Sequence, residues 1–110
     1  MSGFRAVAAL AGAALSLVLP ASALAETEKV RALETRFKPK KVEVDIGDRV
    51  RWVNKEGTHS IVMKEGRQEV DSIISGDASV VSDEFKDSGK HKFFCRIHRA
   101  VDMKGKVIVR

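Results

Sequence analysis

The sequence of 110 residues contains one cysteine, no tyrosine, one tryptophan and two prolines. A single cysteine excludes an intramolecular disulfide, and structural zinc sites are also disfavoured because they use paired Cys and His spacings. Basic side chains outnumber acidic ones by five, but the charges interleave and no basic run carries stacking aromatics. We therefore expect no nucleic-acid partner.

The one long apolar run lies near the N-terminus and is too short to span a membrane. Arg5 precedes Ala6 to Leu19, about 14 residues where a membrane helix needs roughly 20. An A-x-A motif, typical of signal-peptide cleavage sites, ends at Ala25. We expect residues 1–25 to be a signal peptide with no membrane anchor, and residues 26–110 to be one domain exported to a bacterial periplasm.

The lone thiol of Cys95 needs an explanation in an exported domain of this size, where disulfides are common. Such a thiol is open to oxidation unless it is buried, reactive or bound to a metal. A buried structural thiol and a nucleophile paired with His98 are the alternatives to metal ligation. A domain of about 85 residues leaves little room for a substrate cleft, so we expect no enzyme.

Short β-rich runs separated by turn signals fill the rest of the chain, and no helical period persists over ten residues. We predict an all-β fold, a small Greek-key sandwich or barrel. The expected strands cover residues 29–34, 41–45, 49–54, 59–64, 70–74, 80–85, 91–95 and 105–109. Alternation places Val50 and Trp52 in the core, and it places His91, Phe93 and Cys95 together on one inward face.

The C-terminal segment carries three potential metal ligands in a C-x2-H-x4-M spacing: Cys95, His98 and Met103. A loop of this length can present all three side chains to one point. His59 would then come from a different strand at the same end of the sandwich. One thiolate, two imidazoles and one thioether form the ligand set of a type 1 copper site.

Other side chains near this set have competing interpretations. Met63 follows His59 by four residues and is an alternative to Met103, which could instead fill the core before the last strand. His91 lies four strand residues before Cys95, about 13 Å at roughly 3.3 Å per residue, so it cannot bind the same ion. We expect His91 to be a core or boundary residue.

The chain resembles the cupredoxins of the plastocyanin, pseudoazurin and amicyanin group. The resemblance is carried by Phe37-Lys38-Pro39, by the runs Gly47 to Asn54 and His59 to Val62, and by Gly89 to Val109. It implies a cupredoxin-like fold that binds one copper ion. The ligands that it implies are His59, Cys95, His98 and Met103.

The resemblance also implies roles for residues around the ligands, and the chain departs from the family pattern there. His98 would be the solvent-edge ligand through which electrons pass, and Ser60 would tie the two ligand loops together. Ile97 stands where a proline is common and Asp102 where a glycine is common. In place of an apolar docking patch we expect a positive rim that faces an acidic partner. This rim consists of Arg96, Arg99, Lys64 and Lys104.

These features predict an exported, monomeric one-electron carrier that cycles copper between Cu(I) and Cu(II) and exchanges electrons with a donor protein and an acceptor protein. The alternative is a periplasmic copper-handling protein that delivers or stores the metal. Delivery proteins favour exposed Met-rich or His-rich clusters, and residues 26–110 contain neither. A metal-free adhesion module is a third, weaker hypothesis.

Overall fold

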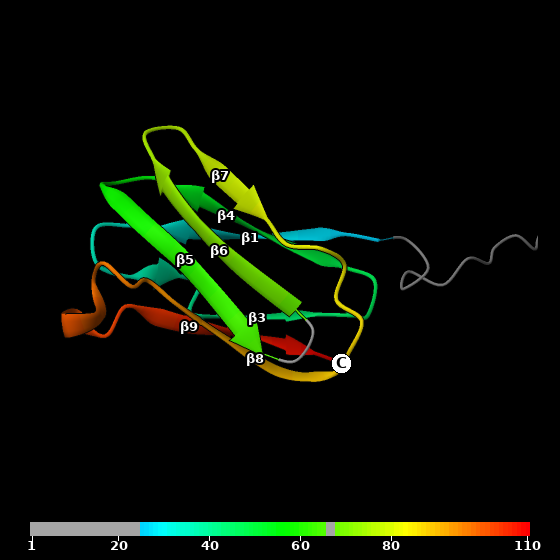
Figure 1. Cartoon of the computed structure of the whole chain (residues 1–110). Helices are drawn as coiled ribbons and strands as arrows, with labels where there is room; N and C mark the ends of the chain where they lie inside the picture. The colour runs from blue at the N-terminus through cyan, green and yellow to red at the C-terminus, as the bar shows by residue number, and fades with distance from the viewer. Residues whose placement is uncertain (1–24, 66–67) are drawn as a thin grey trace, which may run out of the picture.

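A computed structural model describes residues 25–65 and 68–110, so the expected signal peptide lies almost entirely outside the described residues. Two β-sheets face each other across one hydrophobic core (Figure 1). Over the described ranges, no helix is both long enough and apolar enough to cross a membrane.

Nine strands and one short 3-10 helix make up the described part of the chain. The first sheet, in the order β2-β1-β4-β7, is formed by β1 (Thr27–Ala32), β2 (Phe37–Lys38), β4 (Arg49–Asn54) and β7 (Ser79–Val81). The second sheet, in the order β3-β9-β8-β5-β6, is formed by β3 (Lys41–Val44), β5 (Thr58–Glu65), β6 (Gln68–Ser75), β8 (Gly89–Phe94) and β9 (Lys104–Val109). The helix η2 covers Arg99–Val101.

The chain passes repeatedly from one sheet to the other. β1 pairs with β4 and β3 pairs with β9 in parallel, whereas the other strand pairs are antiparallel. The last strand, β9, therefore lies inside the second sheet, between β3 and β8. The all-β sandwich that the sequence predicts is confirmed.

Alternating burial along the strands matches the predicted facing. Val50 and Trp52 on β4 are fully buried. His91 and Phe93 on β8 are buried, and Cys95, directly after this strand, is buried on the same side. The strand that precedes the cysteine thus delivers its sulfur to the core side of the sheet.

Most strand bounds lie within two residues of the prediction, and two strands differ more. Phe37–Lys38 forms an additional short strand, β2, that pairs with β1. The strand expected at 80–85 ends at Val81, because the Val50 N–H donates to the Ser82 side-chain Oγ at 3.0 Å instead of to a backbone carbonyl. A serine side chain that competes for a ladder hydrogen bond interrupts regular pairing.

Aromatic rings fill the centre of the core. Phe37 and Trp52 each meet Phe93 edge to face, with ring centroids 4.9 and 5.3 Å apart, an arrangement that the ring quadrupoles favour. The Phe93 ring also requires a glycine on β9, since a Cβ at Gly105 would lie 2.5 Å from its Cζ atom. This packing fixes β8 against β9 immediately before the loop that carries Cys95.

Candidate metal centre

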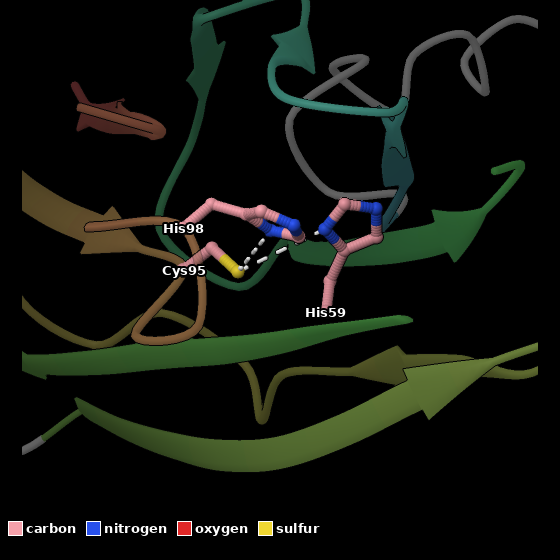
Figure 2. Close-up of side chains that lie close together, drawn as sticks. All are labelled: His59, Cys95 and His98. Atoms are coloured by element: carbon pink, nitrogen blue, oxygen red, sulfur yellow. Dashed lines mark hydrogen bonds between the residues drawn. The ribbon is translucent and has the colours of Figure 1, made fainter. Parts of the chain in front are cut away.

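Three side chains meet at one end of the sandwich, His59 from β5 and both Cys95 and His98 from the loop after β8 (Figure 2). The Cys95 Sγ lies 3.3 Å from the His98 Nδ1 and 3.8 Å from the His59 Nδ1. One potential ligand atom from each of the three residues lies within 4.8 Å of the other two. Atoms bound to one ion at roughly 2.0–2.3 Å are about 3.3–4.0 Å apart, so both sulfur–nitrogen distances match the binding of a single ion.

His59 is held in the orientation that metal binding requires. Its Nε2 lies 2.6 Å from the Glu56 carbonyl oxygen. A carbonyl only accepts, so Nε2 donates its proton and the Nδ1 near Cys95 carries the free lone pair. Burial lowers the pKa of His59, and the nearby His98 lowers it further, although the bond to Glu56 opposes this. The net shift favours the neutral imidazole.

The turn before His59 is fixed from a neighbouring strand. Gly57 has φ +76°, a left-handed conformation that glycine adopts without strain. Asn54, at the end of β4, donates from Nδ2 to the Gly57 carbonyl at 2.9 Å and to the Gly76 carbonyl at 3.0 Å. These bonds tie the β4–β5 turn to the β6–β7 turn and limit the movement of His59.

The loop from Cys95 to Met103 closes on itself. The Cys95 N–H donates to the Met103 carbonyl at 2.9 Å, and the Met103 N–H donates to the His98 carbonyl at 3.4 Å. Asp102, before Met103, has φ +61°. Aspartate tolerates this conformation better than most residues, and a glycine would adopt it freely. The two ends of the loop therefore lie side by side, with Met103 buried next to Cys95.

The two methionines of the domain lie in different places. Met63 is buried on β5, four strand residues beyond His59, or roughly 13 Å at about 3.3 Å per residue. Met103 stands at the end of the ligand loop. His91 is a buried residue, as expected, and its Nε2 lies 3.1 Å from the Asp87 carbonyl oxygen.

Ser60 links the two segments that carry the three side chains. Its Oγ accepts a hydrogen bond from the Arg96 backbone N–H at 2.7 Å and lies 4.0 Å from the Cys95 Sγ. Ser60 follows His59 on β5, whereas Arg96 follows Cys95 in the loop. The hydroxyl therefore fixes the cysteine relative to the first histidine.

The two arginines expected in a positive rim lie on the ligand loop. Arg96 forms an exposed ion pair with Asp71 at 3.4 Å. The guanidinium carbon of Arg99 lies 4.8 Å from the centroid of the Phe94 ring, a cation–π contact.

The two lysines expected in the same rim are placed differently. Lys104, directly after the loop, pairs with Asp102 at 3.4 Å. Lys64 lies five residues along β5 from His59, roughly 16 Å at about 3.3 Å per residue. Arg96, Arg99 and Lys104 thus lie on or beside the loop, whereas Lys64 lies on β5 and belongs to the rim only as a prediction.

Apolar surface beside His98 was not predicted. Ile97 and Val101 have relative exposures of 51% and 56%, and His98 between them is half-buried. Val101 belongs to η2, which buries none of its residues. The sequence places Ile97 directly before the histidine that we expected at the solvent edge, and this neighbour could have indicated the apolar surface. The rim is therefore mixed, with apolar and cationic side chains.

Comparison with known proteins agrees with this geometry. Residues 25–110 match the family of copper binding proteins described as the plastocyanin/azurin family. The chain belongs to this family. As a cupredoxin, it has copper as its cofactor, as its histidine and cysteine cluster indicates.

Relatives and solved structures support the same assignment. The cupredoxin is 33% identical over 113 residues to a chloroplastic plastocyanin of Physcomitrium patens, with 92% of this chain and 67% of the relative covered. It is 29% identical over 113 residues to a chloroplastic plastocyanin of Tetradesmus obliquus, with 94% and 78% covered. The crystal structure of amicyanin from Paracoccus versutus matches with a TM-score of 0.66 at 26% identity, covering 84% of this chain and 86% of that one.

The Ser60 link gives a testable prediction. Ser60→Ala removes the acceptor for the Arg96 N–H, and we expect the free energy of unfolding to fall by roughly 1–3 kcal/mol, the cost of an unsatisfied donor. Urea unfolding of the copper-free protein measures this change. Ser79→Ala, which removes an exposed bond to Arg51, is the control and should cost less than about 0.5 kcal/mol. Equal losses in the two variants would contradict the linking role.

Proposed function

We propose that this cupredoxin is a one-electron carrier whose copper is bound by His59, Cys95 and His98, with Met103 as a weak axial ligand. The observation that supports the proposal most strongly is the convergence of one sulfur and two imidazole nitrogens within 4.8 Å. A thiolate, two imidazoles and a distant thioether form the donor set of electron-transfer copper sites. Met103 is the better axial candidate because it ends the ligand loop beside Cys95, whereas Met63 lies four residues along β5 from His59.

The bound copper would supply a one-electron couple, and the chain keeps the surrounding geometry constant. The Glu56 carbonyl fixes the His59 ring, and the Ser60 hydroxyl fixes the backbone after Cys95. Ligands that are held by supporting hydrogen bonds move little when the charge of the site changes. Electrons would enter and leave at His98, because it is half-buried beside the exposed Ile97.

Burial of the cysteine argues against catalysis. A nucleophilic thiol must reach its substrate, whereas the Cys95 side chain is fully buried. The nearest imidazole nitrogen, at 3.3 Å, belongs to His98 on the same closed loop. Both groups are therefore better placed to bind a metal than to attack a substrate.

Electrochemistry tests the electron-carrier function. Voltammetry of the copper-loaded protein should give one reversible one-electron wave, and repeated cycles beside a Cu(I) chelator should leave most of the copper bound. His98→Ala should lose the wave or release copper quickly. His91→Gln, a change at a histidine outside the cluster, should leave the wave unchanged. Rapid loss of copper from the unmodified protein to the chelator would instead favour copper delivery.

We also propose that residues 1–25 are a cleaved signal peptide and that residues 26–110 act as a monomer in the periplasm. The surroundings of Glu26, which cleavage would make the new N-terminal residue, support the proposed processing. The Glu26 backbone nitrogen lies 3.0 Å from the Asp48 Oδ1, and Asp48 is buried. Cleavage after Ala25 would turn this N–H into an ammonium group beside a carboxylate, which strengthens the hydrogen bond.

Mass spectrometry of protein recovered from the periplasm of an expressing bacterium tests the processing. We expect the mass of residues 26–110, and sedimentation of the same sample should show a monomer. Asp48→Asn should destabilise the processed chain more than a chain that retains Ala25, because only the former gains the ammonium group. A different N-terminus, or an uncleaved chain, would contradict the proposal.

A further inference from the structure

A groove of about 510 Å³ opens on the five-stranded sheet and reaches the ligand loop. Most of the polar side chains that line it carry positive charge. Arg99 is one of them, and the other cations are Lys40, Lys41, Lys90, Lys92, Lys104 and Lys106. Among the described residues, Asp102 is the one carboxylate in the lining. The groove is therefore strongly cationic.

Strand pairing places three of these lysines in a row across the sheet. Lys41 on β3 is directly opposite Lys106 on β9, and Lys106 is directly opposite Lys92 on β8. Neighbouring strands are about 4.8 Å apart, and like charges directly opposite each other destabilise a sheet. Sheet stability alone therefore gives no reason for this arrangement.

Carboxylates of the same chain neutralise little of this charge. Lys104 pairs with Asp102 at 3.4 Å, and Lys41 lies 3.9 Å from Glu43, which also pairs with Arg110 at 3.0 Å. Within residues 25–65 and 68–110, four groove lysines have no carboxylate within 4.0 Å. These are Lys40, Lys90, Lys92 and Lys106. Their charge is available to a partner.

The groove borders the loop that carries Cys95 and His98. Its lining includes Phe94, which directly precedes Cys95, and Met103, which ends the ligand loop. Arg99 contacts the Phe94 ring from the same loop. A molecule seated in the groove would therefore touch the segment that exposes Ile97 and Val101.

We propose that this lysine groove is the docking surface for an acidic redox protein, an inference that rests on the proposed electron-carrier function. The partner's carboxylates lie against the lysines, and its apolar surface meets Ile97 and Val101. Protein interfaces combine a fully buried apolar core with a polar rim, and complementary charge speeds the encounter. A phosphate-bearing polymer or a lipid headgroup matches the charge but not the apolar patch.

Charge reversal within the groove tests the proposal. The copper-loaded protein is adsorbed on gold electrodes coated with a carboxylate-terminated monolayer, which serves as the acidic probe. Lys90→Glu with Lys92→Glu changes two exposed groove residues on β8. The matched control is Lys29→Glu with Arg31→Glu, which reverses two exposed charges on β1 of the other sheet.

At about 10 mM ionic strength, we expect the adsorbed wave of the groove variant to fall by roughly tenfold or more, and that of the control by less than about threefold. The difference in adsorption between the two variants should shrink at high salt, since the Debye screening length falls to roughly 3 Å near 1 M. Equal losses in the two variants would show that only net charge matters and would overturn the proposal. Tighter adsorption of the unmodified protein on a phosphodiester monolayer than on the carboxylate one would also overturn it.

Reduction by hydroquinone, a neutral molecule, separates this proposal from the function on which it rests. All three copper-loaded proteins should be reduced at the same rate, because a neutral reductant is insensitive to the groove charge. Equal hydroquinone rates combined with unchanged adsorption of the groove variant would refute the docking surface alone. Failure of the unmodified protein to be reduced would refute the electron-carrier function instead.

Discussion

The hydrogen bond from the His59 Nε2 to the Glu56 carbonyl is the constraint on which the centre depends. It determines which ring nitrogen carries the proton, so that the other, Nδ1, is free beside Cys95. Burial favours the neutral ring, because it lowers the His59 pKa. Without this bond the ring could rotate or change tautomer, and the cluster would lose one of its three converging atoms.

The sandwich holds the loop that carries Cys95 and His98 in place beside His59. Packing of the Phe93 ring over Gly105 aligns β8 with β9, and the loop between them closes through the bond from Cys95 to Met103. The Ser60 hydroxyl then joins this loop to β5. A closed loop on a packed core leaves few ways for the ligands to move apart. The cationic side chains lie apart from the ligands, in the groove on the five-stranded sheet, where under our proposal they would direct a partner to the loop.

Local pattern predicted the part of the centre that lies on the C-terminal loop, and the family resemblance added His59 from β5, but neither predicted the charged surface around the centre. The spacing of Cys95, His98 and Met103 and the alternation on β8 are short-range features, and the inward facing of Cys95 follows from them. The groove depends instead on the parallel pairing of Lys41 with Lys106, residues far apart in sequence. The early end of β7 depends on the Ser82 side chain. The exposure of Val101 depends on the geometry of η2, and the spacing of apolar residues in the sequence does not reveal that geometry.

Visible absorption during titration of residues 26–110 with Cu(II) tests the central claim most directly. An intense thiolate-to-copper charge-transfer band should rise, saturate at one equivalent and disappear on reduction. The same titration of Cys95→Ser should show no such band, because the sulfur is the source of the transition. A band that persists in Cys95→Ser, or none in the unmodified chain, would contradict the copper centre that His59, Cys95 and His98 form in this account.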